Sequence, residues 1–378
     1  MAKLGDIATY INGYAFKPQD WSDEGIPIIR IQDLTGNSYQ ANRYNGEYAS
    51  KYEVNDGDVL ISWSASLGVY IWHGEKAVLN QHIFKVVFDK ERISKDFFVH
   101  QVGLILENAA SDAHGATMKH LTKPVFDALP FYLPPYEKQC EIAEVLDKVT
   151  SLISLRKQQL AKLDELVKAR FVETFGDMLL NSLGWSEKPL ECLADIVSGI
   201  TKGRKTTETD LQEVPYMAVS NVKNGYIDWT TVKTILVTRQ EMEQYRLLPG
   251  DILMTEGGDP DKVGRGAIIK KPLENSIHQN HIFRVRLDES ELLPSFFAEY
   301  LQHQKAKRYF LGCAKQTTGI ASINMRQLKA LPVLLPPFFL QNEFAAFVER
   351  VDQQKQTVQQ SLEKLELMKK ALMQEYFG

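Results

Sequence analysis

The sequence predicts an α+β fold in which two related mixed α/β domains are separated by two long antiparallel coiled-coil helices. Residues 129–139 read LPFYLPPYEKQ, and residues 331–341 repeat them as LPVLLPPFFLQ. The segment after each copy has helical periodicity and ends at Gly176 or Gly378, 202 residues apart. Because the two segments have the same length, we predict an internal repeat with a pseudo-twofold axis.

The first domain is expected at residues 1–135. Its strand-like runs include Val59–Ile61, Ala77–Leu79 and Phe84–Phe88, which Gly, Asn and Asp turns separate. A helical pattern covers Asp96–Asn108. Alternating short strands and one helix predict a mixed domain.

Residues 136–178 form the first predicted spacer helix. Pro135 precedes it, Gly176 lies at its C-terminal stop, and no Gly or Pro interrupts the helical pattern between them. About 40 residues would give a helix roughly 60 Å long. Its apolar seam is predicted at Ile142, Leu146, Val149, Ile153, Leu160, Leu163 and Val167.

The second domain is expected at residues 179–335 and repeats framework runs of the first. Gly250–Leu253 matches Gly57–Leu60, and Asn280–Val285 matches Gln81–Val86. The spacing between matched runs differs, as in scaffolds whose loops carry function. We expect His82 and His281, which lie within the matched runs, to be structural packing residues.

Residues 336–378 form the second predicted spacer helix. An isolated amphipathic helix would leave its apolar seam in water, so the two helices are expected to pack together. Connectivity then requires them to run antiparallel. The seam of the second helix is predicted at Phe344, Val348, Val351, Val358, Leu362 and Leu365.

Composition limits the function classes. Three scattered cysteines, no signal-peptide pattern and no membrane-length apolar run predict a cytoplasmic protein. The formal net charge of −4 gives no global attraction to nucleic acid, so DNA binding would need local basic patches.

Catalytic motifs are missing from the sequence. Leu133-Pro134-Pro135-Tyr136 differs from the (Asp/Asn/Ser)-Pro-Pro-(Tyr/Phe) motif of amino-methyltransferases, because leucine cannot hold the target amine. The eight histidines match no HExxH pattern, and the cysteines match no zinc spacing. We therefore predict no catalytic residue, no metal site and no cofactor in this chain.

Polar and basic loops are the candidate DNA contacts. Gly, Thr and Lys recur at matching places, in His114–His120 and in Lys315–Gly319, and suit phosphate and groove-edge contacts. A solvated loop remains the alternative for any single residue. The candidates are Trp63, Ser64, Thr117, Lys119 and His120 in the first domain, and Lys202, Arg204, Lys205, Arg265, Lys315, Thr317, Thr318, Ser322 and Asn324 in the second.

The whole chain resembles the specificity subunit of a type I restriction-modification system. The resemblance lies in LPP-x₃-Q at 133–139 and 335–341, in Phe175-Gly176-Asp177 and in the terminal Tyr-Phe-Gly. It implies two target-recognition domains, each reading half of a split DNA sequence, and no catalysis. It also implies two modification subunits that methylate adenine with S-adenosylmethionine, and restriction subunits that use ATP and Mg.

Two other classes remain open. A self-sufficient methyltransferase-nuclease would need a cofactor loop and a polar-Pro-Pro-aromatic motif, and neither is present in the sequence. A coiled-coil adaptor would bind only proteins and have no DNA specificity. A methyltransferase encoded nearby that co-purifies with the chain would favour the specificity subunit.

Overall fold

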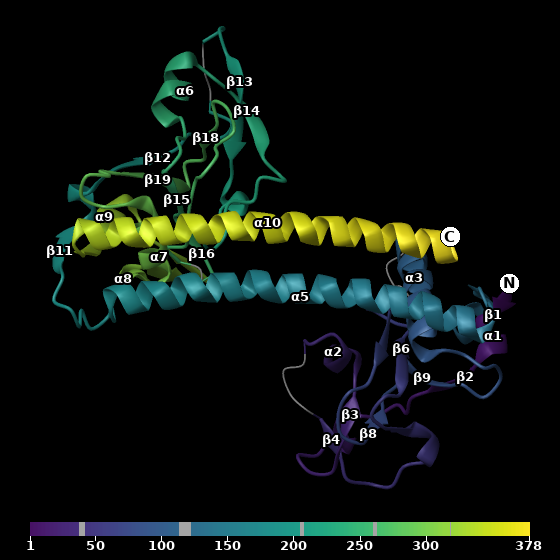
Figure 1. Cartoon of the computed structure of the whole chain (residues 1–378). Coiled ribbons are helices and arrows are strands. Elements are labelled where there is room, and N and C mark those ends of the chain that lie inside the picture. Colours follow the sequence, from purple (N-terminus) through teal and green to yellow (C-terminus); the bar gives the residue numbers. More distant parts are fainter. Residues whose placement is uncertain (38–41, 113–121, 205–207, 260–262, 318) are drawn as a thin grey trace. The chain divides into compact units, whose positions relative to one another are not determined.

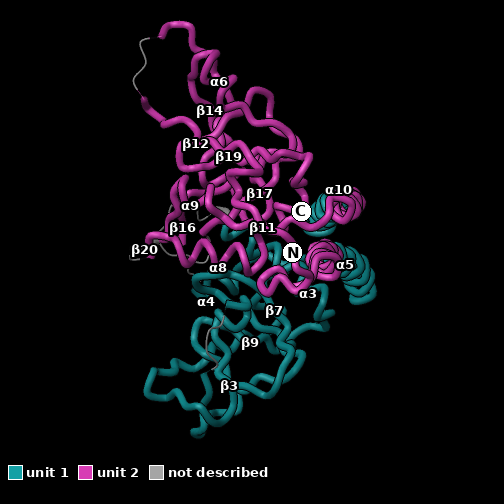
Figure 2. The backbone as a smooth tube through the Cα atoms, turned by 90° about the vertical axis from the view of Figure 1, so that its left-hand side faces the viewer, with its two compact units in different colours: residues 1–157, 360–378 teal, residues 158–359 magenta. Residues whose placement is uncertain are grey.

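A computed structural model describes residues 1–37, 42–112, 122–204, 208–259, 263–317 and 319–378. The chain divides into two compact units (Figure 2). Unit 1 comprises residues 1–157 and 360–378, and unit 2 comprises residues 158–359. Both divisions fall inside a long helix, whereas the predicted domain boundaries fall near the helix ends.

Unit 1 contains a four-stranded antiparallel sheet of order β2-β9-β6-β7 and a second sheet of order β4-β3-β8-β5. In the second sheet β3 and β8 are parallel, and β1 pairs separately with β10. The strands are β1 (Ala2–Lys3), β2 (Thr9–Asn12), β3 (Ile26–Ile29), β4 (Arg43–Tyr44), β5 (Glu53–Val54), β6 (Val59–Ser62), β7 (Gly68–Ile71), β8 (Ala77–Leu79), β9 (Ile83–Val87) and β10 (Pro130–Phe131). The helices are α1 (Leu4–Ile7), α2 (Ile31–Leu34), α3 (Lys95–Asp112), α4 (Lys123–Asp127) and parts of α5 (Tyr136–Phe175) and α10 (Phe338–Phe377), with 3₁₀ turns η1 (Pro18–Asp20) and η2 (Ser50–Tyr52).

Unit 2 repeats this plan with sheets of order β12-β19-β15-β17 and β14-β13-β18, and β11 pairs with β22. It adds a small sheet of order β16-β21-β20. The strands are β11 (Ser186–Pro189), β12 (Ala194–Ser198), β13 (Gln212–Met217), β14 (Lys233–Val237), β15 (Ile252–Thr255), β16 (Gly257–Gly258), β17 (Gly266–Ile268), β18 (Ile277–His278), β19 (Ile282–Leu287), β20 (Lys315–Thr317), β21 (Ile320–Ser322) and β22 (Pro332–Leu335). Besides parts of α5 and α10, the helices are α6 (Arg239–Tyr245), α7 (Pro294–Gln302), α8 (Gln304–Cys313) and α9 (Met325–Lys329), with 3₁₀ turns η3 (Leu190–Cys192) and η4 (Val219–Asn221).

The repeated Gly-Asp pair forms the same turn in both units. Gly57 and Gly250 have φ values of +81° and +90°, a region that glycine adopts without steric cost. Asp58 accepts a hydrogen bond from the Asn55 amide at 2.8 Å, and Asp251 accepts one from the Leu248 amide at 2.7 Å. The motif therefore sets the entry into the central strands β6 and β15.

Each unit has its own core, to which both long helices contribute. In unit 1, Leu146 of α5 and Phe377 of α10 pack in the core around Phe97, and the Phe97 and Phe377 rings lie 5.4 Å apart.

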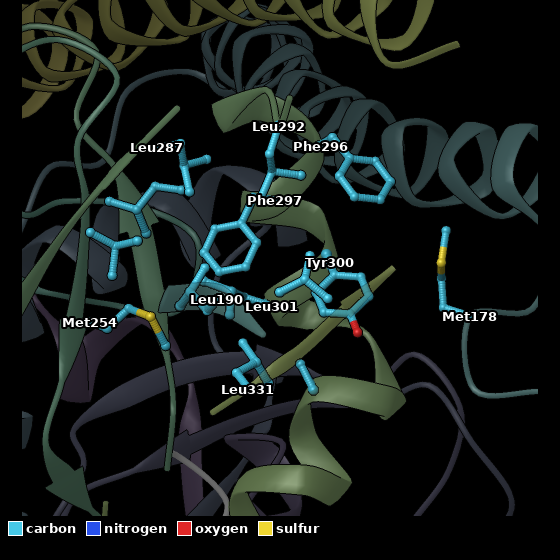
Figure 3. Packing of buried hydrophobic residues seen from close by; sticks show 14 of the residues in the cluster. Met178, Leu190, Met254, Leu287, Leu292, Phe296, Phe297, Tyr300, Leu301 and Leu331 are labelled. Atoms are coloured by element: carbon cyan, nitrogen blue, oxygen red, sulfur yellow. The ribbon is translucent and has the colours of Figure 1, made fainter. Parts of the chain in front are cut away.

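In unit 2, Phe171 and Phe175 of α5 pack on Phe296 of α7, with ring centroids 5.4 Å and 4.8 Å apart. Figure 3 shows Phe296 beside Phe297 and Tyr300 in this cluster. We call the part of each unit outside the long helices its head. Each head is therefore fixed to the start of one long helix and to the end of the other.

Contacts within each unit show that α5 and α10 run antiparallel (Figure 1). Lys157 pairs with Glu366 at 3.1 Å in unit 1, and Asp164 pairs with Lys355 in unit 2, so one residue number rises as the other falls. The predicted fold class is confirmed. Of the predicted seam, Ile142, Leu146, Val149, Leu163, Val167, Phe344, Val351, Val358 and Leu362 are buried, and Ile153, Leu160, Val348 and Leu365 are half-buried.

The glutamine of each LPP-x₃-Q repeat joins a head to its helix. Gln139 is 1% exposed, accepts a hydrogen bond from the Ser94 amide at 2.9 Å and donates one to the Pro134 carbonyl at 2.9 Å. Gln341, also 1% exposed, accepts from the Leu293 amide at 3.0 Å and donates to the Pro336 carbonyl at 3.0 Å. Because buried amides need such partners, these bonds explain the repeated residue.

His278 should make unit 2 sensitive to acid. Burial, together with the positive charge of Arg284, lowers the pKa of His278 from 6.5 to about 4. As the pH falls, the His278 imidazole is protonated near pH 6.5 in the unfolded chain but only near pH 4 in the folded chain. The stability that the neutral, buried His278 contributes is therefore complete above pH 6.5 and is lost as the pH falls toward 4. We expect a loss of about 2 kcal/mol between pH 7 and pH 5 from this group.

Hydrogen exchange of the β12, β13 and β18 amides at both pH values measures this loss. The His278→Gln variant should lose that part of the pH dependence. His73→Gln, whose side chain is 75% exposed in unit 1, is the matched control. An unchanged pH dependence in His278→Gln would contradict the assignment.

Candidate nucleic-acid interface

The small sheet of unit 2 brings two predicted contact residues together. In it, Ser322 of β21 lies opposite Gly257 of β16 on one side and Lys315 of β20 on the other. Lys315 is exposed and Ser322 is half-buried. The repeated Gly-Thr-Lys signal therefore marks a real sheet in this head, with a lysine on its outer strand.

Arg265 lies next to the same strands. Its carbonyl accepts a hydrogen bond from the Thr255 amide at 3.1 Å, at the point where β15 leads into β16. The preceding Gly264 has a φ of +70°, and a Cβ atom there would lie 2.1 Å from the Phe310 ring of α8. Only glycine fits this close approach, which packs the backbone just before Arg265 against α8.

Asn324 has a structural task that the sequence did not reveal. Its side-chain oxygen accepts a hydrogen bond from the Gln327 amide at 3.0 Å, and Gln327 Oε1 accepts one from the Asn324 amide at 2.8 Å. This capping box starts α9. Tyr309 donates to the Gln327 carbonyl at 2.8 Å, and burial raises the pKa of this tyrosine. Base reading by Asn324 stays a prediction, best tested with Asn324→Ser, which retains a cap.

Lys202 and Arg204 occupy a different part of unit 2. The Arg204 guanidinium forms a two-pronged ion pair with Glu241 of α6, with Nε and Oε1 2.7 Å apart. The positive charge of Arg204 is thus already compensated within the head. Lys202 is exposed in a turn, so of these two residues it is the more accessible cation.

Two of the five predicted residues of unit 1, Trp63 and Ser64, follow the end of β6. The Trp63 ring stacks on Phe84, with centroids 5.6 Å apart, and its Nε1 donates to Asn12 Oδ1 at 3.1 Å. Trp63 remains half-buried, whereas Ser64 is only 6% exposed. Of the two, Trp63 presents the larger surface to a ligand.

The matched histidines differ in their surroundings. His82 is half-buried, with its ring 4.9 Å from Trp63, as expected for a packing residue. His281 instead has a side chain that is 57% exposed and is paired with Glu256. The expectation that both histidines pack is therefore wrong for His281, because a neighbouring carboxylate holds it at the surface.

Several predicted contacts cannot be placed. Thr117, Lys119 and His120 of the first domain, and Lys205 and Thr318 of the second, lie outside the described residues. Thr317 belongs to β20, and only its backbone is described.

Sequence reasoning missed a basic helix beside the small sheet. α8 carries Lys305, Lys307 and Arg308, of which Arg308 is exposed and Lys305 is paired with Glu187 at 2.6 Å. The run Lys-Ala-Lys-Arg was the available signal. At the matching place in unit 1, residues 103–112 of α3 contain no lysine or arginine. The two heads thus share a framework and differ in surface charge.

Lys315→Ala should weaken DNA binding without changing the sequence preference. An exposed lysine on an edge strand suits a phosphate contact, and loss of one such contact lowers the salt slope of log K by about one. Lys233→Ala, at an exposed position of β14 in the same unit, is the matched control. The measurement is a salt series with target and unrelated DNA. A loss confined to one target base would contradict a phosphate contact.

Among the described residues, no helix combines the length and apolar character required to cross a membrane.

The chain is similar to known proteins over most of its length. The family model "Type I restriction modification DNA specificity domain" matches residues 1–165 and 183–367. The Escherichia coli type I restriction enzyme EcoBI specificity subunit is 23% identical, with 92% of this chain and 78% of that protein covered. The EcoKI specificity subunit of Escherichia coli strain K12 is 22% identical, with 93% and 81% covered.

A solved structure agrees with the fold. The crystal structure of the type I restriction-modification S subunit from M. genitalium matches with a TM-score of 0.58 at 14% identity, covering all of this chain and 95% of that one. The family model spans both heads and most of both long helices. The chain therefore belongs to the family of type I restriction-modification DNA specificity proteins.

Proposed function

We propose that this chain is the non-catalytic specificity subunit of a type I restriction-modification complex. Each head reads one half of a bipartite, asymmetric DNA target, and the paired helices set the distance between the halves. One observation carries this proposal: the strand order β2-β9-β6-β7 of the first head recurs as β12-β19-β15-β17 in the second, but the side chains beside these sheets differ. Helix α8 carries Lys305, Lys307 and Arg308, whereas residues 103–112 of α3, at the matching place in unit 1, contain no lysine or arginine.

The proposed protein partners are two modification subunits and the restriction subunits. The solvent-facing sides of the helices supply docking surfaces, because large apolar side chains are exposed there. They are Val145, Leu152, Leu155, Leu166 and Val172 on α5, and Phe338, Phe339, Leu367 and Met368 on α10. The partner subunits would bind S-adenosylmethionine, ATP and Mg. The assembled complex would methylate adenine and cleave DNA, and we expect it in the cytoplasm.

The experiment that tests this function is co-expression with a methyltransferase encoded nearby, followed by mapping of methylated adenines. We expect a two-part motif that disappears when this chain is omitted. Methylation that does not depend on the chain would overturn the proposal.

The isolated chain should bind DNA weakly and with strong salt dependence. Its net charge is −4, and of the predicted contact cations that the structure describes, only Lys202 and Lys315 are exposed. Specific affinity should appear only when the modification subunits complete the protein surface around DNA. A binding titration at about 0.15 M salt measures this. Sequence-specific binding near about 10 nM by the lone chain would contradict the prediction.

A further inference from the structure

Glu256 and His281 form an exposed polar pair at the end of the central sheet of unit 2. Glu256 Oε2 lies 2.6 Å from His281 Nδ1, and the Glu256 amide donates to the His281 carbonyl at 3.0 Å. The side chains are 36% and 57% exposed. Asn280 Nδ2 lies 3.4 Å from His281 Nε2. The pair is thus fixed through backbone and side-chain contacts while it still faces solvent.

The backbone on both sides of Glu256 belongs to strands. Thr255 ends β15, Gly257 begins β16, and the Glu256 carbonyl accepts from the Ile323 amide at 2.8 Å. Through this register the pair lies beside Ser322, which in turn lies opposite Lys315. A side chain carried on a rigid strand is positioned more accurately than one on a free loop.

The first head has the same backbone contact with different chemistry. The Trp63 amide donates to the His82 carbonyl at 3.2 Å, as the Glu256 amide does to His281. There, an indole packs on the imidazole at 4.9 Å in place of the ion pair. One framework position therefore presents an acceptor in one head and an aromatic ring in the other.

Stability does not account for the Glu256–His281 pair. An exposed ion pair contributes little to folding, because solvent screens it and ordering the side chains costs entropy. In head one, Trp63 packs on the buried Phe84, so its ring also stabilises the core.

We propose that Glu256, oriented by His281, selects a base that presents an exocyclic amino group in the major groove of the half-site read by the second head. An ionised carboxylate only accepts hydrogen bonds. In the major groove, cytosine N4 and adenine N6 donate, whereas guanine O6 and thymine O4 accept and would be disfavoured. His281 holds one carboxylate oxygen and leaves the other to meet the base. This inference rests on the proposed DNA-reading function.

The test uses Glu256→Gln in the full complex with its modification subunits. A carboxamide both donates and accepts, so discrimination against guanine and thymine at one position of the second half-site should fall by about tenfold. The first half-site should not change. His281→Gln should relax the same position to a smaller extent, because it affects only the orientation of the carboxylate. Glu243→Gln, at an exposed position of α6, is the matched control and should keep the motif.

Two measurements separate the outcomes. Mapping of methylated adenines gives the motif, and competition binding with duplexes varied at each second half-site position gives the preference even if methylation is lost. An unchanged preference in Glu256→Gln, with the wild-type complex still specific, would overturn this inference alone. A wild-type complex without chain-dependent specificity would instead overturn the proposed function.

Discussion

Insertion of four residues after Lys157 in α5 and after Gln359 in α10 should lengthen the preferred spacer between half-sites by about one to two base pairs. These residues occupy matching positions, 202 apart, and they are where the two compact units divide. Four helical residues add about 6 Å. Base pairs rise about 3.4 Å along a strand, so each head should meet DNA farther from the other. The phase change of a four-residue insertion can be absorbed by local unwinding of the paired helices.

Methylation of DNA with graded spacers measures this shift. Insertion into α5 alone is the control. It should give the smaller shift, about one base pair, because the uncut α10 still joins both units. The half-site sequences should stay the same, since no head residue changes. A folded, active double-insertion complex that keeps its original spacer would mean that other subunits set the distance.

Replacement of residues 188–330 with the head of a related protein should change one half of the methylated motif and leave the other half intact. Unit 2 has its own sheets and core, so its loops can be exchanged as a block. The exchange is joined at β11 and β22, which pair from Ser186–Leu335 to Pro189–Pro332. Because this pairing uses backbone groups, different side chains should be tolerated there.

The incoming head must preserve the packing against the helices. Phe296 contacts Phe171 and Phe175, and Gln341 donates to the Glu291 carbonyl at 3.1 Å. A second exchange that retains Glu291, Leu293 and Phe296 is therefore the matched control for folding. Motif mapping gives the result. A change in both halves of the motif would contradict independent reading by the two heads.

The long helices and the duplication were predictable from the sequence because both follow from the order of residues within short segments. The heptad seam and the flanking Pro and Gly residues predicted helices of about 40 residues, and the structure has α5 at Tyr136–Phe175 and α10 at Phe338–Phe377. The Gly-Asp turn was also visible as a repeated motif, because glycine is required where φ is positive.

The candidate site was only partly predictable. Lys315 and Ser322 were predicted as contacts because their segment stands out as a polar loop, whereas Glu256, which precedes the Gly257 that pairs with Ser322, was not considered. Glu256 lies 25 residues from His281, and nothing in the local sequence links the two. Likewise, Arg204 looked like a free cation until the structure placed Glu241 beside it.

The sequence by itself determined that two similar heads alternate with two equal helices, since repeat offsets and helical periods depend only on residue order. The tertiary structure decided which side chains face solvent and which are paired. Long-range strand pairing brings Glu256 to His281 and Gly257 to Ser322. Packing places Phe377 at the C-terminus in the core of unit 1. Such contacts join segments that are distant in the chain, so a local sequence pattern cannot specify them. They are specified by the register in which the strands pair.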